Sequence, residues 1–408
     1  MTEEVEPSAR KLAHARIVAI VDAAEPPPPI AADSLKEPVR SRRKMRCAKS
    51  AKDRCRAEVR KKEGTSKRKR TPQRDSVLEL VDQRTAELWH DPSGEPFITF
   101  WTDGHAEHHA VRSAENRRWL SLIYFHATGG TLGGQAMTDA LLALEARAVH
   151  CGPCYPWWRR VGKFGDNLYL DLCAHAWQAV ASGADGWRTL AAPPLKFLRT
   201  PAMRPLPQPQ AGELIESLRG FVNVATDDDF TLLVAWLIAA LRPGGPYPVL
   251  ALSGEQGSGK SAAAKVLREL IDPNDAPSRS VPRDDRDLIV AAFNAHCLTF
   301  DNLSSVPVWF ADAICRLATG AGYSTRRLHT DSEEQVFAGA KPCILNGIAS
   351  LTDRADLADR ALAIHLPTMS ETNRRPEKEF WQAFETAKAG ILGALLDGVS
   401  AALRNLPR

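Results

Sequence analysis

The residues best suited to chemistry form one short stretch that is rich in glycine. It reads Gly254, Glu255, Gln256, Gly257, Ser258, Gly259, Lys260, Ser261. Glycines permit positive φ, so the backbone N–H groups can turn inward around an anion. Lys260 brings an ammonium to the same oxygens, and the Ser261 hydroxyl can ligate Mg²⁺. These residue types predict a loop that binds the phosphates of ATP, with Mg²⁺ beside them.

The segments on either side of the loop fit this prediction. The apolar run 247–252 precedes the loop, and residues 260–271 have the pattern of a helix. Strand, loop and helix in this order are the context that the motif G-x-x-x-x-G-K-[ST] requires. A glycine-rich turn with a purely structural role needs neither flank. The helix would also direct the positive end of its dipole toward the anion.

An acidic residue that could also bind the metal follows the loop by about forty residues. The apolar segment 297–300 ends in Asp301, followed by Asn302. A carboxylate at the end of a buried strand beside a phosphate loop is the Walker B pattern, and it holds Mg²⁺ through the water shell of the ion. Asp301 is therefore the second predicted metal residue.

Two further groups follow toward the C-terminus. Asn346 ends the apolar segment 342–345, where its amide could contact the γ-phosphate or the attacking water, or could only cap the next turn. Arg354 and Arg360 alternate with acids just before another strand. One of them could stabilise a transferring phosphoryl group in a neighbouring subunit, or both could form ordinary surface ion pairs.

Taken together, the order and spacing of these groups from Gly254 to Arg360 resemble those of the superfamily 3 helicases of the AAA+ class. The resemblance is strongest to the primase-helicase ATPases of phages and integrative elements. It implies that Asn346 is a sensor, and that Arg360 rather than Arg354 is an arginine finger. It also implies a homo-hexamer, because the nucleotide site is completed between subunits.

The same resemblance assigns the DNA contacts. Residues 319–331 fall where the family has a hairpin whose basic residues face the central channel of a ring. This makes Arg326, Arg327 and His329 the expected contacts to the backbone of single-stranded or forked DNA, without sequence preference. Other phrases, among them Tyr169-Leu-Asp-Leu and Leu345-Asn-Gly-Ile, are similar to ATP-binding proteins of such elements, so the resemblance covers about residues 85–400.

Two departures from the family pattern limit what it implies. Asn302 stands where such helicases usually carry a second acid that polarises water. Either Asp301 acts alone, or Asp284, Asp285 or Asp287 reaches the site, or hydrolysis is slow. In addition, no acidic cluster of a primase is evident upstream, so primer synthesis is not predicted.

The charge distribution separates the N-terminal region from the rest. The net charge is +4, but residues 1–75 hold 21 Lys/Arg against 11 Asp/Glu, with the excess between 40 and 70. A proline run at 26–29 precedes this basic block. Such a segment cannot pack a core, so residues 1–75 are predicted to be a disordered arm that attracts nucleic acid, or alternatively a solvated tail.

The remaining pattern predicts two domains. Residues 76–206 read as a small α+β accessory domain, with a hairpin over 95–111, helices at 114–127 and 134–149, and four short strands between 168 and 199. Residues 210–408 read as an α/β P-loop ATPase domain. Its expected helices are 212–221, 227–241, 285–294, 307–318 and 377–404, with strands at 297–300, 342–345 and 361–366 and a polar hairpin at 322–337.

Other signals carry less weight. The eight cysteines form no disulfide framework, and with neither a secretory signal nor a membrane-spanning run the protein is expected to be cytoplasmic. Cys151-Gly-Pro-Cys154 matches thioredoxins by letter, but a helix rather than a strand precedes it. Trp157 to Arg160 could stack on single-stranded bases, or could be half-buried tryptophans with solvated arginines.

The sequence therefore predicts an ATP- and Mg²⁺-dependent DNA motor that replicates a mobile element or phage. A non-motor ATP switch that assembles a ring or recruits a partner on DNA stays open because of Asn302. A structural DNA-binding protein dominated by the basic arm is the third possibility.

Overall fold

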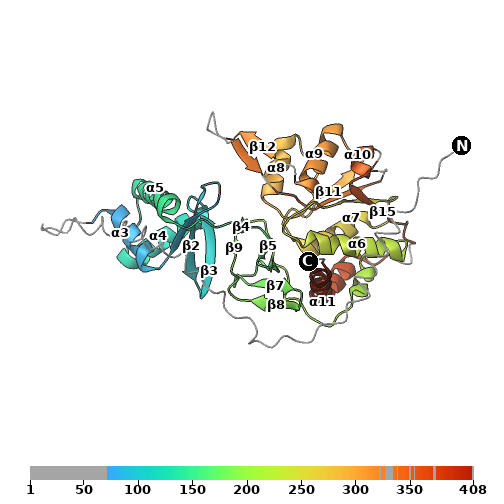
Figure 1. Cartoon of the computed structure of the whole chain (residues 1–408), viewed down its shortest axis with the longest axis horizontal. Coiled ribbons are helices and arrows are strands. Elements are labelled where there is room, and N and C mark those ends of the chain that lie inside the picture. Colours follow the sequence, from blue (N-terminus) through green and yellow to red (C-terminus); the bar gives the residue numbers. More distant parts are fainter. Residues whose placement is uncertain are drawn as a thin grey trace. The chain divides into compact units, whose positions relative to one another are not determined.

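The computed structural model divides the chain into two compact units (Figure 1). We call residues 71–158 with 194–199 the N-terminal unit, and residues 159–193 with those from 200 onward the C-terminal unit. The structure describes residues 71–320, 323–326, 334–337, 339–348, 351–352, 354–370 and 374–406. Most of the predicted basic arm, residues 1–70, lies outside the described residues. The arm was predicted to end at residue 75, but helix α3 already begins at Gln73.

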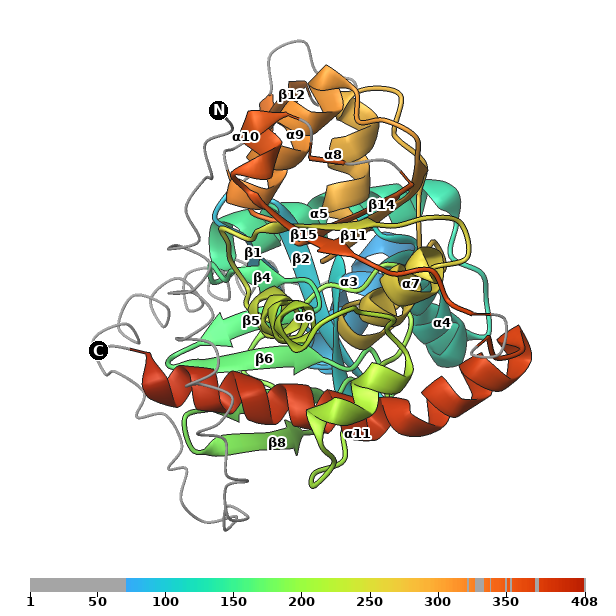
Figure 2. The same cartoon turned by 90° about the vertical axis from the view of Figure 1, so that its right-hand side faces the viewer.

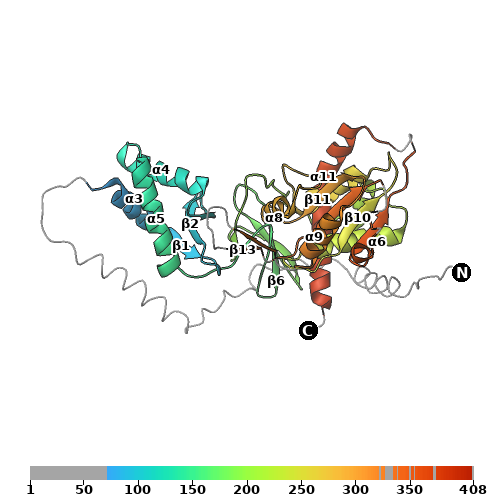
Figure 3. The same cartoon turned by 90° about the horizontal axis from the view of Figure 1, so that it is seen from above.

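The N-terminal unit is an antiparallel sheet covered on one face by helices, as Figures 1 and 3 show. The sheet has the order β1-β2-β3, and β4 pairs separately with β9. The elements are α3 (Gln73–Gln83), β1 (Glu87–His90), β2 (Pro96–Thr102), β3 (His105–Ala110), α4 (Ala114–Thr128), α5 (Gly134–Cys151), β4 (Trp157–Trp158) and β9 (Lys196–Phe197). Phe100 of β2 stacks on Trp119 of α4 with ring centroids 4.4 Å apart, which fixes the helix layer on the sheet.

The predicted hairpin of this unit is confirmed. Asp103 and Gly104 have φ of 49° and 84°, the pair of positive φ angles that a two-residue turn requires. The Cys-Gly-Pro-Cys segment is also structural, since Cys151 ends α5 and the Pro153 carbonyl accepts a hydrogen bond from the His90 N–H. A Cβ at Gly152 would overlap the backbone of β1, so the glycine permits close packing.

The C-terminal unit is built on a parallel sheet with helices on both faces (Figures 1 and 2). The strand order is β11-β14-β10-β15, and all three pairings are parallel. The elements of this layer are α6 (Asp227–Ala240), β10 (Val249–Ser253), α7 (Lys260–Ile271), α8 (Asp285–Phe293), β11 (Leu298–Leu303), α9 (Val308–Thr319), β14 (Cys343–Gly347), α10 (Ala355–Ala358) and β15 (Ala361–His365). In addition, β12 (Tyr323–Arg326) and β13 (Glu334–Phe337) form an antiparallel pair within the predicted hairpin region.

Alternate residues of β10 belong to two separate cores. Leu250 and Leu252 lie in the core with α6 and α7, whereas Val249 and Ala251 lie in the core with α8 and α9. Successive side chains of a strand point to opposite faces, so a sheet covered on both sides needs apolar residues at every position. This explains the unbroken apolar run before the loop.

A second, antiparallel sheet of the C-terminal unit has the order β5-β6-β7-β8. Its strands are β5 (Val161–Phe164), β6 (Asn167–Asp171), β7 (Ala179–Gly183) and β8 (Gly186–Leu190). Strands β7 and β8 contact the last helix, α11 (Glu377–Asn405), and Leu170 and Val180 share a core with it. The compact units therefore divide at residue 158, which differs from the predicted domain boundary near 206.

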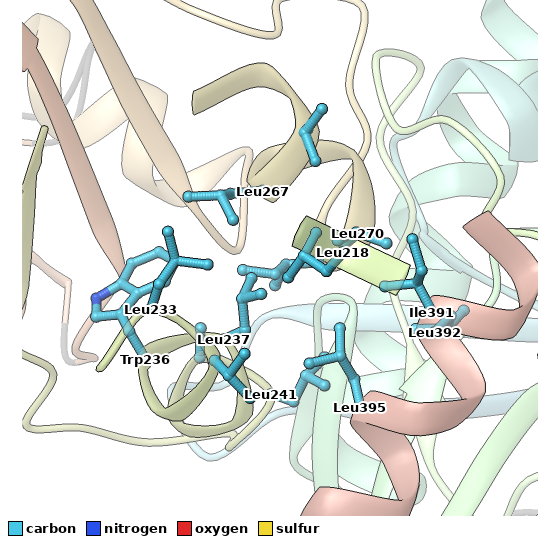
Figure 4. Close-up of a cluster of buried hydrophobic side chains, with 14 of the residues drawn as sticks. Leu218, Leu233, Trp236, Leu237, Leu241, Leu267, Leu270, Ile391, Leu392 and Leu395 are labelled. Carbon is cyan, nitrogen blue, oxygen red and sulfur yellow. The ribbon is translucent and has the colours of Figure 1, made fainter. Parts of the chain in front are cut away.

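Helix α11 is long and apolar enough to cross a bilayer by length and composition, with a mean hydropathy of 1.3 over its most apolar window. However, 61% of that window is buried within the protein. Figure 4 shows Ile391, Leu392 and Leu395 of α11 directed toward leucines of α6 and α7. We therefore assign α11 as a core helix. Within the part of the chain that the structure describes, it is the one helix long and apolar enough for such a span.

A buried charge cluster connects β5–β8 to α7. Arg160 is fully buried, and its guanidinium donates to Asp272 at 2.9 Å (Nε to Oδ1). Burial alone would raise the pKa of Asp272, but Arg160 and Arg268 outweigh it and hold that pKa below its usual range. Arg159 and Arg160 are both buried, so they are neither solvated nor available to stack on bases. Trp157 and Trp158 are half-buried, as the second interpretation of the Trp-Arg run expected.

Most predicted elements are present within one to three residues. The main exception is the predicted helix 212–221, which is a 3-10 helix, η1 (Ile215–Gly220). Its apolar residues are spaced for burial, but Gly212 has φ of 91°, which no α-helix accommodates. Sequence patterns also missed α3, β1, β4 and β5.

Candidate functional site

The glycine-rich loop joins β10 to α7 at the carboxyl edge of the parallel sheet. Gly254, Gly257 and Gly259 all have positive φ, at 153°, 85° and 82°. These are conformations that a residue with a Cβ rarely adopts. Helix α7 begins at Lys260, so its N-terminal end faces the loop. The backbone is thus arranged as an anion cradle would require.

Lys260 is folded back over this loop. Its Nζ donates to the Glu255 carbonyl at 2.7 Å and lies 3.4 Å from the Ser258 Oγ. Burial lowers the pKa of Lys260, and the nearby Asp301 carboxylate partly offsets this effect. The side chains of Glu255 and Gln256 are exposed, so those two residues contribute backbone rather than side chains to the cradle.

Three polar side chains from different elements meet beside the loop. The Ser261 Oγ donates to the Asp301 Oδ1 at 3.1 Å. The Asn346 Nδ2 donates to the same carboxylate oxygen at 2.6 Å and to the Ser261 Oγ at 3.2 Å. Asn346 is 1% exposed, so its amide is fixed by these contacts. The arrangement brings a hydroxyl, a carboxylate and an amide to one point.

The sheet order explains this meeting. Strand β14 lies between β10 and β11, and Phe300 is paired with Leu345 while Leu252 is paired with Asn346. Because the strands are parallel, their carboxyl ends reach the same edge. Asp301 and Asn346 therefore meet although 45 residues separate them.

Asn302 occupies an irregular position. The pairing of β11 with β14 shifts register between Phe300 and Leu303, and Asn302 has φ of 57°. Asparagine is among the residues that tolerate this left-handed conformation. Its side chain is exposed and its N–H donates to the Asp301 Oδ1 at 2.7 Å. The local bulge thus accounts for the residue type.

Two of the three alternative acids have other partners. Asp284 caps α8 by accepting from the Asp287 N–H at 2.9 Å, and Asp285 forms an ion pair with Arg316 at 3.2 Å. Asp287 lines a cavity that also includes Arg279 and Phe300. The contacts found in the described part of the chain connect none of the three acids to Ser261 or Asp301.

The two candidate arginine fingers differ in their surroundings. Arg354 forms ion pairs with Asp312 and Asp356, both at 3.0 Å. Arg360 is exposed, and its guanidinium donates to the backbone oxygen of Asp356 at 2.8 Å. Arg360 is thus the more available of the two.

The predicted DNA contacts are only partly within the described structure. Arg326 ends strand β12, whose backbone alone is described. Arg327 and His329 lie outside the described residues. Their role therefore stays a prediction from the sequence.

Sequence reasoning missed a segment that follows β15 and lies against the loop. The Asn223 Nδ2 donates to the Ser258 and Pro367 carbonyls at 3.1 and 2.5 Å, which ties the two segments together. The Thr368 Oγ1 contacts the Glu255 carboxylate at 3.3 Å. These residues belong to no motif, and no local signal in the sequence marks them.

The donor set fits a nucleotide with Mg²⁺. Hydroxyl and carboxylate oxygens from Ser261 and Asp301 are hard ligands of the kind Mg²⁺ takes. A Cβ at Gly257 or Gly259 would fill space against neighbouring side chains, so the bare backbone keeps the cradle open. Among the described residues, no group of three or more His, Cys, Asp and Glu side chains is arranged to hold a metal.

Comparison with known proteins associates this region with replication. Residues 215–406, a little under half of the chain, match the family model of the actinomycete integrative conjugative element replication protein. The match contains the loop, Asp301, Asn346 and Arg360. No curated protein matches the chain.

Solved structures share a remote likeness. The A form apo structure of the NrS-1 C-terminal region is 14% identical, with a TM-score of 0.43, covering 81% of this chain and 69% of that chain. A second apo structure of that region is 13% identical, with a TM-score of 0.41 and coverages of 83% and 70%. The X-ray structure of JCV helicase is 13% identical, with a TM-score of 0.29 and coverages of 45% and 52%. Likeness at this level assigns neither activity nor site residues.

Proposed function

We propose that the chain is an ATP- and Mg²⁺-dependent, helicase-type motor that acts on DNA during replication of an integrative element. The observation that carries this proposal is the meeting of Ser261, Asp301 and Asn346 beside the glycine loop. The family match supports the replicative setting. A loop that only turned the chain would not need a buried amide and a carboxylate converging on the first hydroxyl of the next helix.

In this proposal each group has a distinct role. The loop amides and Lys260 bind the β- and γ-phosphates, and Lys260 exchanges its contact with the Glu255 carbonyl for phosphate oxygens. Ser261 and Asp301 hold Mg²⁺, which when bound neutralises charge on the phosphates. Asn346 orients the attacking water or the γ-phosphate. Charge stabilisation by positioned groups dominates phosphoryl transfer, so this geometry suits hydrolysis.

Arg360 would act on the site of a neighbouring subunit. It directly precedes β15, and its carbonyl accepts from the Val249 N–H at the start of β10. The loop lies at the other end of the same strands, about 15 Å away at roughly 3.3 Å per residue. Because Arg360 cannot reach its own loop across that distance, a role at the phosphates requires a second copy, as in a hexameric ring.

A second candidate is a nucleotide switch that binds ATP without rapid turnover. Asn302 favours it, because the position after Asp301 carries no acid, Asp284 caps α8 and Asp285 is paired with Arg316. In that case ATP would drive assembly or partner recruitment on DNA rather than strand separation.

The steady-state rate of ATP hydrolysis, with and without single-stranded DNA, separates these candidates. Turnover that rises with DNA and disappears in Lys260→Ala supports the motor. Tight ATP binding with negligible turnover in both conditions contradicts the motor and favours the switch. Deletion of residues 1–70 tests the third possibility, since ATP-dependent DNA binding should persist in a motor and be lost in a protein that binds through its arm.

A further inference from the structure

The segment that follows β15 covers the phosphate loop of its own subunit. Leu366 extends the pairing of β15, with its N–H donating to the Ser253 carbonyl at 2.8 Å. The chain then passes over the loop, where the Met369 N–H lies 3.4 Å from the Gly257 carbonyl. A Cβ built on Gly259 would lie 3.0 Å from the Met369 Cε. This covering segment, residues 366–370, is therefore in direct contact with the cradle.

Arg374, a few residues farther along, brings a positive charge to the same place. A Cβ built on Gly257 would lie 2.5 Å from Nη2 of Arg374 and 3.4 Å from its Cζ. The guanidinium thus lies against the face of Gly257 that has no side chain. Arg374 is exposed, so its side chain is open to solvent beside the loop.

The surroundings of this guanidinium contain mainly groups that attract anions. The loop presents backbone N–H groups and the N-terminal end of α7, and Lys260 lies among them. Glu255 is the acid of the loop itself, and its carboxylate is in contact with the Thr368 hydroxyl. A planar guanidinium with several donors is well suited to phosphate oxygens, which it can bind in pairs.

We propose that Arg374 binds the phosphate chain of the nucleotide held by its own subunit. This inference rests on the proposed ATP site and deepens it by adding a second cation to Lys260. The role differs from that of Arg360, which lies at the opposite edge of the sheet and could act only on another copy. Arg374 is therefore expected to strengthen nucleotide binding in an isolated subunit.

The test is equilibrium binding of a fluorescent ATP analogue, at a protein concentration where mass photometry detects only monomers. Loss of one charge-assisted contact predicts that Arg374→Ala raises Kd about tenfold or more, with a smaller rise for Arg374→Lys. Arg375→Ala is the matched control, since it removes the same charge from the next, also exposed, residue.

Each outcome decides a separate point. The first case is that the wild-type chain binds the analogue, Lys260→Ala abolishes binding and Arg374→Ala does not weaken it. This result would overturn the role of Arg374 and would leave the ATP site supported. An equal loss in Arg374→Ala and Arg375→Ala would mean a general charge effect and would also overturn it. Failure of the wild-type chain to bind the analogue would contradict both the site and this inference. An unchanged melting temperature in Arg374→Ala excludes misfolding as the cause.

Discussion

Asn346 and Asn302 stand at the ends of neighbouring strands, yet their surroundings differ sharply. Asn346 is buried and donates to both Ser261 and Asp301. Asn302 is exposed on a bulge. In the proposed function Asn346 therefore acts at the phosphates, whereas Asn302 serves the backbone geometry of the bulge.

We expect Asn346→Ala to lower kcat for ATP about 100-fold, because a positioned donor at a charged centre is removed. The Kd for ATP should change only a few-fold, since the loop and Lys260 are retained. Asn302→Ala is the control and should retain most of the turnover. Single-turnover hydrolysis with separately measured binding checks both variants. Equal losses of turnover in the two variants would contradict this assignment.

A buried histidine contributes to the acid sensitivity of the C-terminal unit. His296 is 4% exposed, and its Nε2 lies 2.7 Å from the Ala240 carbonyl. Burial, together with the positive charge of Lys341, lowers the pKa of His296 to about 4, although Asp272 opposes the shift. The native state therefore keeps this imidazole neutral where the unfolded chain, with a pKa near 6.5, becomes protonated.

The sign of the pH dependence follows from this difference. The unfolded state binds more protons between pH 6.5 and 4, so the stability from the neutral imidazole is complete above pH 6.5 and is lost as the pH falls to 4. We expect the free energy of unfolding to be about 2 kcal/mol smaller at pH 5 than at pH 7.5. Urea titrations at several pH values should show this decrease in the free energy of unfolding. The His296→Gln variant should show a smaller dependence on pH. An unchanged pH dependence in that variant would refute the assignment.

At the scale of elements, the glycines of α11 mark where other segments touch the helix. A Cβ at Gly393 would overlap the backbone oxygen of Gln210, whereas one at Gly398 would lie 2.6 Å from the Ile238 Cδ1. The Gln210 N–H also donates to the Ala389 carbonyl at 2.9 Å. The first neighbour is fixed backbone, and the second is the flexible end of a side chain.

Gly393→Ala should therefore destabilise the C-terminal unit by about 1–3 kcal/mol through overpacking. Gly398→Ala should cost less, because Ile238 can move and alanine favours the helix by roughly 1 kcal/mol. Chemical denaturation of the two variants side by side measures the difference. Similar stabilities of the two variants would contradict this expectation, because they would mean that the backbone at Gln210 moves as easily as a side chain.

The sequence predicted the core of the site because each part is local: an apolar strand, a glycine loop and a helix start identify themselves within fifteen residues. It also located Asp301 and Asn346, since each ends an apolar strand. It could not show that the two share one carboxylate oxygen with Ser261, which depends on β14 lying between β10 and β11. Arg374 was invisible for the same reason, because only the path of the chain after β15 brings it to Gly257.

The position of the unit boundary had no local signal either. The proline-rich stretch 201–209 is typical of a linker, but strands β5–β8, which precede it, share a core with α11 nearly two hundred residues later. Arg160 reaches Asp272 in the same way. Contacts between segments so far apart leave no periodicity in the sequence.

For the whole molecule, the core that β5–β8 share with α11 predicts where the chain can be divided into stable fragments. A fragment of residues 159–408 should unfold cooperatively, because it retains β5–β8 on α11. A fragment of residues 207–408 should bind a hydrophobic dye and aggregate, because it exposes the face of α11 and leaves Asp272 without Arg160. Loss of one partner of a buried ion pair costs roughly 3–5 kcal/mol. Cooperative unfolding of the shorter fragment would contradict the shared core.

The parallel sheet gives the C-terminal unit a direction, with the loop at one end of the strands and Arg360 at the other. A two-fold dimer meets this requirement if its interface is self-complementary, since each loop then receives the arginine of its partner. Head-to-tail contact meets it as well, but each subunit then gives its arginine to one neighbour and receives one from another. An open row of subunits then always leaves one loop at its end without an arginine, and closure into a ring removes that deficit. If Arg360 acts between subunits of such a row, specific activity should increase with the length of the row and level off once the row closes, whereas a two-fold pair would reach full activity at the dimer.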